Sequence, residues 1–464
     1  MTRVLLTALA ALFYLAVSAQ DITGQWNGIL EVQGTQLRLV FNVAQTGSGY
    51  SSTLDSPDQG AKSIPVTITT FEDSLLTFEV SNLNILYKGT WKGDDIEGTF
   101  KQAGQSFPLN LSRKPVEKQV VKRPQEPVKP YPYRAEDITF RNADANITLA
   151  GTLTLPNKEG NFPVVILITG SGAQNRDEEL FGHKPFLVIA DYLTRNGIAV
   201  LRYDDRGFGQ SQGNFSKATS ADFAKDVESA VAYLKTRKKI DPVKIGLIGH
   251  SEGGVVAPMV ASTNRDISFI VLLAGTGIRG DSLLLLQQEA IAKASGMPEQ
   301  RIQESKVVNR KAFDMVLQSA STEALKTNLT AYIKQVLHNN PGEIPNGMTE
   351  DAFTALQVNQ LISPWMQYFI QYDPAAALQK ITCPVLALNG EKDLQVPAKE
   401  NLHAIETALK KAGNRNATIV PLPGLNHLFQ DCTTGLPNEY ANIEETFSPA
   451  ALDRITRWIK EQDQ

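Results

Sequence analysis

Clusters of basic residues are almost absent from this 464-residue sequence. It contains 45 Lys and Arg against 49 Asp and Glu, carries a formal net charge of −4, and has one short lysine-rich stretch near residue 120. Nucleic-acid binding depends on a basic surface that neutralises phosphates. A nucleic-acid partner is therefore not expected.

Long apolar runs are also missing. The run Val4–Leu15 follows Arg3 and precedes the small residues 17–19, a pattern typical of a cleaved signal peptide. The run is short for a membrane-spanning helix, although an uncleaved membrane anchor is the alternative. We interpret residues 1–19 as a signal peptide for export to the periplasm or beyond. Because no cysteine comes directly after the cleavage site, we expect no lipid anchor. We also expect no integral membrane segment after cleavage.

The remaining chain predicts more than one domain, since 464 residues with 42% hydrophobic and 20% charged residues exceed one ordinary globular unit. Apolar and polar residues alternate over residues 20–112, which predicts a small antiparallel β-barrel or sandwich domain. Residues 113–134 contain five prolines and predict a semi-rigid linker. Over residues 135–464 strand and helix patterns alternate, which predicts an α/β domain with a mostly parallel central sheet and helices on both faces.

The stretch VKIGLIGHSEGG at residues 243–254 predicts a buried strand, a sharp turn and a helix. That context suits a nucleophile elbow, in which the serine of G-x-S-x-G has a strained backbone and the glycines relieve crowding. Ser251 is the candidate nucleophile. The alternative for the pentapeptide alone is a strand-to-helix turn with a capping serine.

A second glycine turn follows the buried strand PVVILITGSG at residues 163–172. In this architecture one oxyanion N–H comes from that turn and the other from the residue after the nucleophile. We therefore assign the backbone N–H groups of Ser171 and Glu252 to the oxyanion hole, with Gly172 as the alternative to Ser171.

Two later strands end in candidate partners for the serine. Asp393 follows the strand at 384–390, and His427 follows the last strand at 417–421. The order Ser, Asp, His, each at the carboxyl end of a separate strand, predicts a catalytic triad. Asp204, Asp205 and Arg206 also follow a strand, but we interpret them as a structural ion-paired turn.

The connection between the strand at 267–275 and the strand at 384–390 is unusually long and has helical patterns of its own. We predict that residues 276–375 form a helical lid over the site. Five aromatic residues of this segment are candidates for an acyl pocket or for lid core: Phe313, Trp365, Tyr368, Phe369 and Tyr372.

The motifs GSG at 170–172, DDRGFGQS at 204–211, GHSEGG at 249–254, GEKDLQVP at 390–397 and GLNH at 424–427 resemble those of the α/β-hydrolase superfamily. They are similar to those of exported EstD-type carboxylesterases and serine aminopeptidase-like hydrolases. The resemblance implies a Ser251, Asp393, His427 triad, no metal, no cofactor, and hydrolysis of small-molecule carboxylic esters.

Two alternatives stay open. A peptidase of the serine aminopeptidase type would need a carboxylate for the free amine of its substrate, for which Glu289, Glu304 and Glu350 are candidates. A glycan- or lipid-binding protein with an inert hydrolase domain is the other. Acyl specificity, the role of the β-domain and the oligomeric state do not follow from the sequence.

The two cysteines, Cys383 and Cys432, should not form a disulfide. Cys383 begins the strand that ends near Asp393, so about six residues at roughly 3.3 Å each separate it from the catalytic edge. Cys432 lies five residues after His427, on that edge. A disulfide needs Cα atoms within about 7 Å. A peptide map under non-reducing conditions should contain both cysteines unlinked, and a linked peptide would contradict this topology.

Overall fold

The computed structural model describes residues 21–32, 35–47, 49–57, 61–102, 105–116, 121–344 and 348–462. The chain divides into two compact units, one that ends at residue 118 and a larger one from residue 119 onward. The predicted signal peptide, residues 1–19, lies outside the described residues. Within the described ranges, no helix combines the length and the apolar character needed to cross a membrane.

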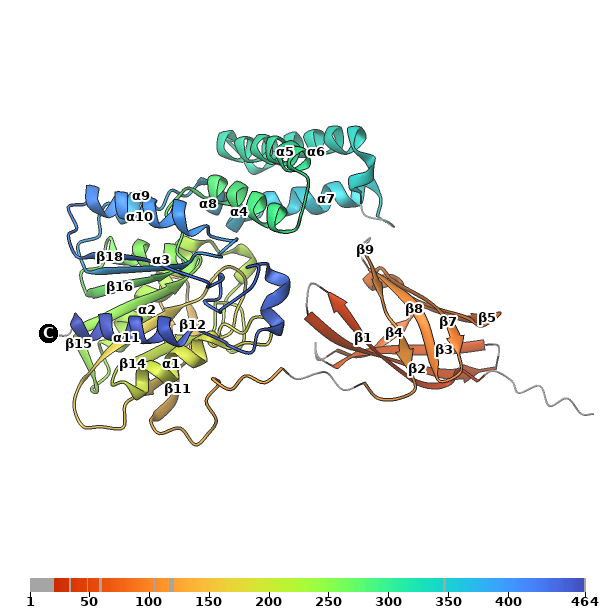
Figure 1. Ribbon diagram of the computed structural model, residues 1–464, viewed down its shortest axis with the longest axis horizontal. Helices are drawn as coiled ribbons and strands as arrows, with labels where there is room; N and C mark the ends of the chain where they lie inside the picture. The colour runs from red at the N-terminus through yellow and green to blue at the C-terminus, as the bar shows by residue number, and fades with distance from the viewer. Residues whose placement is uncertain are drawn as a thin grey trace, which may run out of the picture. The chain divides into compact units, whose positions relative to one another are not determined.

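The smaller unit is all β, as the alternation predicted. Its described strands form one antiparallel sheet in the order β4-β3-β2-β1-β10-β8-β7-β6-β5, with β9 paired to β8 (Figure 1). The inward residues of each strand form a core in which the rings of Phe41 and Phe78 stack at 4.3 Å. Trp26 is fully buried there, and its indole N–H donates to the Ile22 carbonyl at 2.8 Å. The tryptophan is thus a core residue.

The strands of this unit are β1 Gly24–Val32, β2 Thr35–Thr46, β3 Gly49–Ser56, β4 Ala61–Val66, β5 Ile68–Glu72, β6 Leu75–Val80, β7 Ile85–Lys92, β8 Asp95–Gln102, β9 Gln105–Pro108 and β10 Leu111–Ser112.

The larger unit is built on an eight-stranded sheet in the order β11-β12-β14-β13-β15-β16-β17-β18. β12 is antiparallel to both its neighbours, β11 and β14. From β14 onward in the sheet order, each strand is parallel to the next: β14, β13, β15, β16, β17 and β18. The strands are β11 Arg134–Asn142, β12 Ile147–Leu155, β13 Phe162–Ile168, β14 Ala199–Tyr203, β15 Ile240–His250, β16 Ile267–Leu273, β17 Val385–Gly390 and β18 Ala417–Leu422.

Helices cover both faces of this sheet, which is why its central strands are continuous apolar runs. Helices α2 (Ser220–Leu234), α3 (Gly253–Ala261) and α10 (Ala398–Lys411) pack in the core on one face. Helices α1 (Pro185–Arg195) and α11 (Pro449–Glu461) pack in the core on the other. An α/β domain that follows an all-β unit along the chain agrees with the predicted fold class.

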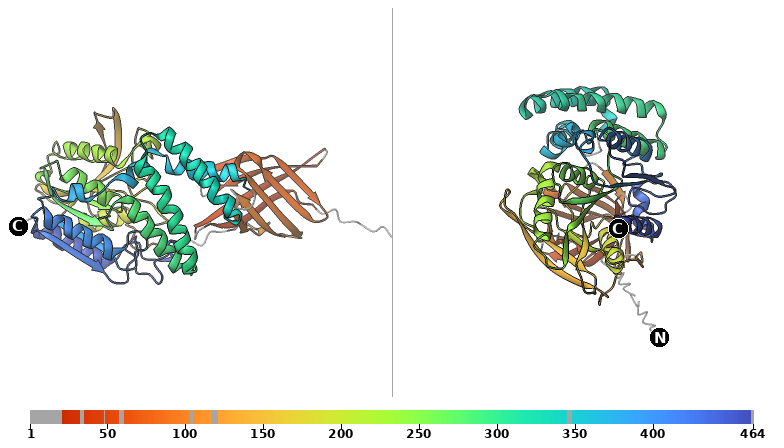
Figure 2. Two further views of the ribbon diagram at one scale, coloured as in Figure 1. Left: turned by 90° about the horizontal axis from the view of Figure 1, so that it is seen from above. Right: turned by 90° about the vertical axis from the view of Figure 1, so that its left-hand side faces the viewer.

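A helical segment separates β16 from β17. It contains α4 Gly280–Ala294, α5 Glu299–Gln318, α6 Thr322–Asn339, α7 Glu350–Leu361, α8 Pro364–Gln371 and the short α9 Ala375–Leu378. The segment has a core of its own, in which Phe313 and Val316 of α5 meet Leu325 and Leu329 of α6. Helices α5 and α6 (teal) pack side by side, and Figure 1 and the right-hand view of Figure 2 show them as the outer layer of the segment.

The proline-rich stretch before β11 contacts the rest of the larger unit through side-chain hydrogen bonds. Arg123 donates to the carbonyls of Gly182, at 3.2 Å, and Ala441, at 2.7 Å, and also to that of Ile443. Gln125 accepts from the N–H groups of Thr446 and Phe447. The sequence predicted a semi-rigid linker here, and these two side chains attach it to the chain between His427 and α11.

Both cysteines have free thiols. Cys383 lies just before β17, and the Cys432 thiol donates to the Gly424 carbonyl at 3.3 Å. Burial raises the pKa of each thiol to about 11, so neither is an activated nucleophile.

These contacts predict where the larger unit can be cut. A chain that starts at residue 119 should unfold at a higher temperature than one that starts at Tyr131, because the shorter chain loses the hydrogen bonds of Arg123 and Gln125, each contributing about 1 kcal/mol. In the full chain Gln125→Ala should lower the Tm, whereas Lys122→Ala, at an exposed neighbour, should not. Equal melting temperatures for the two truncated chains would show that the stretch is only a spacer.

Candidate active site

Ser251 lies in a sharp turn between β15 and α3. Its φ angle is 52°, in the left-handed region that a serine rarely adopts. Its N–H donates to the Leu273 carbonyl at 2.8 Å. Ser251 therefore has the strained strand-to-helix geometry expected for the elbow.

Asp393 and His427 come together at the same edge of the sheet. His427 Nδ1 lies 2.8 Å from Asp393 Oδ2, and both side chains are almost completely buried. The other oxygen, Asp393 Oδ1, accepts from the N–H groups of Gln395 and Val396, at 2.8 Å each. These bonds fix the carboxylate, and the carboxylate fixes the tautomer of the imidazole.

Ser251 and His427 line one cavity of about 440 Å³. Among the described residues, none is a hydrogen-bond partner of the Ser251 hydroxyl. Such contacts are often long in the absence of substrate. The structure thus places the three predicted triad residues around one site, with the aspartate and histidine already paired.

The glycine turn after β13 lies directly beside the serine. A Cβ added to Gly170 would lie 3.2 Å from Ser251 Cβ. The Gly170 N–H is already occupied, since it donates to Glu178 Oε1 at 2.8 Å. Within the described ranges, the N–H groups of Ser171 and Glu252 have no acceptor, so both are available to a ligand.

Asp204, Asp205 and Arg206 form ionic and polar contacts, but with residues other than one another. Asp204 pairs with Arg176, at 2.8 Å, and Arg206 pairs with Asp226, at 2.7 Å. Asp205 Oδ1 accepts from the Thr169 hydroxyl at 2.7 Å, and Oδ2 accepts from the Gln174 N–H at 2.9 Å. These three residues are therefore held by partners outside the DDR turn. Asp205 accepts hydrogen bonds from both sides of the glycine turn at residues 170–172.

Asp205 is an unusual carboxyl group. Burial raises its pKa to about 8; Glu178 and Glu252 act in the same direction, and the bonds from Thr169 and Gln174 oppose the shift. Asp204 behaves in the opposite way, because Arg176 lowers its pKa in spite of burial.

Glu252 contributes a buried carboxyl group beside the serine. Its Oε1 accepts from the Ser220 hydroxyl at 2.5 Å and from the Trp365 indole N–H at 2.8 Å. Burial raises the pKa of Glu252, and the bonds from Ser220 and Trp365 only partly offset this. The side chain thus links the elbow to α2 and to α8 of the helical segment.

Helices α4 and α8 supply much of the cavity wall. Trp365 and Phe369 line it, together with Leu283, Leu284 and Met366. Of the other aromatic candidates, Phe313 lies in the core of the helical segment, and Tyr368 and Tyr372 stack on each other at 5.6 Å. Only two of the five candidates therefore reach the cavity that contains Ser251.

The three acids considered for an amine site lie elsewhere. Glu289 pairs with Lys293 and Lys306, Glu304 lines a separate cavity between α5, α6 and α7, and Glu350 is exposed at the start of α7. None of them lines the cavity of Ser251.

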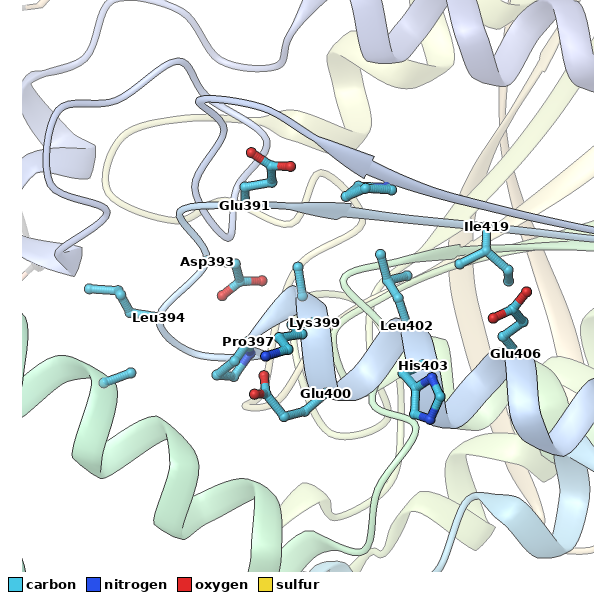
Figure 3. Close-up of a pocket in the computed structure, with 13 residues that line it drawn as sticks. Glu391, Asp393, Leu394, Pro397, Lys399, Glu400, Leu402, His403, Glu406 and Ile419 are labelled. Carbon is cyan, nitrogen blue, oxygen red and sulfur yellow. The ribbon is translucent and has the colours of Figure 1, made fainter.

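A larger cavity of about 660 Å³ lies beside the loop that carries Asp393 and Leu394 (Figure 3). Its ionisable lining residues are Glu391, Asp393, Lys399, Glu400, His403 and Glu406. Neither Ser251 nor His427 lines it, so this cavity is distinct from the one that contains the serine, and Asp393 lies between the two. In the described part of the chain, no group of three His, Cys, Asp or Glu residues is arranged to hold a metal ion.

Two site residues escaped the sequence analysis, Glu178 and His250. Glu178 Oε1 lies 2.9 Å from His250 Nδ1, and His250 Nε2 lies 3.0 Å from the His427 carbonyl oxygen. The position of His250, directly before Ser251, was a signal in the motif. Glu178 gave no signal, because it lies in an irregular loop between β13 and α1.

This strand order, with an elbow after β15 and a histidine after the last strand, is the α/β-hydrolase arrangement that the motifs predicted. Residues 185–339 match the sequence model of the serine aminopeptidase S33 family. That segment contains Ser251 but neither Asp393 nor His427. The predicted resemblance is confirmed, and the chain is an enzyme of the hydrolase class.

The relatives extend over more of the chain. It is 26% identical over 334 residues to esterase EstD of Thermotoga maritima, a match that covers 72% of this chain and 69% of EstD. It is 24% identical over 253 residues to an uncharacterised 31.7 kDa protein of Escherichia coli, covering 53% of this chain and 79% of that protein.

Solved structures with a similar arrangement include an α/β hydrolase from Penicillium and an esterase from Pyrococcus furiosus. The Penicillium protein is 18% identical, with a TM-score of 0.46, and the match covers 71% of this chain and 99% of that one. The Pyrococcus esterase is 16% identical, with a TM-score of 0.44 and coverage of 75% and 99%.

The raised pKa of Asp205 predicts a pH-dependent effect on stability. The folded state keeps the proton up to about pH 8, whereas the unfolded chain releases it near pH 4, so the native state loses stability as the pH rises between these values. The amide introduced by Asp205→Asn cannot ionise. Its oxygen can accept from the Gln174 N–H while its NH₂ group donates to the Thr169 hydroxyl. The Tm of Asp205→Asn relative to wild type should therefore be higher at pH 8 than at pH 5.

Asp204→Asn is the matched control for this experiment. Because the pKa of Asp204 is lowered, its ionised form stabilises the fold above pH 4, and the variant should be less stable than wild type at neutral pH. Thermal unfolding at pH 5 and pH 8 checks both signs. A Tm difference for Asp205→Asn that is the same at both values would contradict the protonated carboxyl.

Proposed function

We propose that this chain is an exported serine hydrolase that cleaves small-molecule carboxylic esters through an acyl-enzyme. Ser251 is the nucleophile, His427 the general base and Asp393 the acid that orients His427. The observation that carries the proposal is the 2.8 Å bond from His427 Nδ1 to the buried Asp393 carboxylate, with the imidazole on the same cavity as the strained Ser251.

The chemistry follows from this tautomer. With Nδ1–H donated to Asp393, Nε2 has a free lone pair and takes the Ser251 proton while the serine oxygen attacks the ester carbonyl. The N–H groups of Ser171 and Glu252 stabilise the oxyanion. The imidazolium then protonates the leaving alcohol, and water releases the acyl group in a second half-cycle.

The helical segment, residues 276–375, acts as a lid in this proposal. Leu283, Leu284 and Phe369 give the cavity an apolar wall, which suits an acyl chain of modest length. The domain boundaries 20–112, 113–134 and 135–464 stay a proposal, as does export, which rests on residues 1–19. The β-domain then serves in targeting, substrate capture or partner contact.

An ester substrate is supported by the name of the Thermotoga relative, and a peptide substrate by the name of the S33 family. A serine aminopeptidase needs a carboxylate for the substrate amine. Glu289, Glu304 and Glu350 are absent from the cavity lining. Glu252 does line the cavity, with Oε1 occupied by Ser220 and Trp365 and Oε2 without a partner among the described residues. Burial raises the pKa of Glu252, which disfavours the anionic form that a substrate amine would need. These positions favour the esterase.

Substitution of the triad tests the proposal. Ser251→Ala and His427→Ala should lower ester turnover by about three orders of magnitude or more, and Asp393→Asn by less, because the triad acts as a unit. The Tm of Ser251→Ala should stay close to that of wild type, since the side chain packs little apolar surface. The assay is a series of p-nitrophenyl esters of increasing chain length beside aminoacyl anilides.

Labelling with a fluorophosphonate separates the alternatives. A labelled wild type and an unlabelled Ser251→Ala variant are expected. An unlabelled wild type would favour a binding protein with an inert hydrolase domain, and anilide turnover above ester turnover would favour the peptidase. An active Ser251→Ala variant would show that the nucleophile is a different residue.

A further inference from the structure

His250 is a buried histidine whose two ring nitrogens both have acceptors. Nδ1 lies 2.9 Å from Glu178 Oε1, and Nε2 lies 3.0 Å from the His427 carbonyl oxygen. The side chains of His250 and Glu178 are 5% and 1% exposed. A carbonyl oxygen and a carboxylate can only accept, so both nitrogens donate when Glu178 is ionised. His250 is then an imidazolium paired with Glu178.

The energetics agree with this protonation state. Burial alone would favour a neutral ring, but Glu178, the His427 carbonyl and Asp393 outweigh it and raise the pKa of His250. A buried charge is tolerated when it is paired and fully hydrogen-bonded. His250 meets this condition through two bonds to separate parts of the chain.

Glu178 connects the pair to the glycine turn. The same Oε1 atom accepts from the Gly170 N–H at 2.8 Å, and Gly170 precedes Ser171. Glu178 itself has a left-handed φ of 52°, an unfavourable conformation that surrounding contacts must maintain. The bonds therefore run from the glycine turn through Glu178 and His250 to the backbone of His427.

We infer that Glu178 and His250 are a positioning pair, which holds the glycine turn and the His427 loop in register around Ser251 and places a positive charge beside His427. The inference rests on the proposed function. Neither side chain takes part in bond making. Both act through Gly170 and His427.

The positive charge of His250 lies close to the ring of His427. The rings of His250 and His427 are 4.9 Å apart between centroids, and the Glu178 carboxylate is bonded to Nδ1 of His250. A positive charge on His250 repels the imidazolium that His427 forms when it takes the serine proton in the proposed reaction. Asp393, bonded to His427, acts in the opposite sense. Asp205 and Glu252, the other carboxyl groups that surround the site, have raised pKa values.

Two amide substitutions test the pair. Glu178→Gln keeps an acceptor for Gly170 but removes the carboxylate that keeps the buried His250 protonated, so the ring becomes neutral. His250→Gln keeps a donor for the His427 carbonyl but removes the positive charge. In both variants the acidic limb of the kcat/KM profile for p-nitrophenyl acetate should move up by about 0.5–1 pH unit. At the plateau, kcat should fall about tenfold with KM within about twofold, because positioning affects the transition state.

Rates are normalised to the Ser251 that a fluorophosphonate labels, so partial misfolding cannot imitate the effect. Glu228→Gln is the matched control, since Glu228 pairs with Lys225 on the outer side of α2, and its profile should equal that of wild type. If Glu178→Gln fails to fold, His250→Gln gives the same test. Normalised profiles of both variants that superimpose on wild type would overturn the positioning pair alone, whereas an unlabelled wild type would overturn the proposed function.

Discussion

The site depends on the close approach of backbones at the elbow. A Cβ at Gly249 would lie 1.9 Å from the Gly253 carbonyl oxygen, and one at Gly253 would lie 2.1 Å from the Ile168 carbonyl oxygen. Contacts this short exclude any side chain, so α3 can lie against β13 and β15 only with glycine at these positions. The turn after β13 also lies within contact of Ser251, which has a left-handed conformation at the centre of this approach.

Around this turn the fold buries four carboxyl groups in two different ways. Asp393 and Glu178 each face an imidazole, His427 and His250, and are stabilised by a partner that can carry positive charge. Asp205 and Glu252 have only neutral donors, and burial raises their pKa values. The paired carboxyl groups contact the base and the residue before the nucleophile, whereas the unpaired ones anchor the glycine turn and the helical segment.

The sequence predicted the positions that follow from strand order. Parallel strands end at one edge, so Ser251, Asp393 and His427 had to approach one another once their strands were recognised. Glu178 could not be found in this way, because an irregular loop carries it and its role exists only through contact with His250. Arg123 and Gln125 were missed for another reason. Proline prevents regular backbone pairing, but side chains between prolines can still bond distant carbonyls.

The helical segment differs chemically from the sheet edge that it faces. Its residues in the cavity of Ser251 are Thr276, Leu283, Leu284, Gln287, Gln360, Trp365, Met366 and Phe369, and none of them is ionisable. The ionisable groups of the site that the structure describes lie instead at the carboxyl ends of the strands and on the loops that follow them. A neutral wall keeps the local dielectric low, which strengthens the bond of Asp393 to His427. It also offers no countercharge to a substrate, so shape and apolar contact determine which acyl group enters, while the strand ends determine the chemistry.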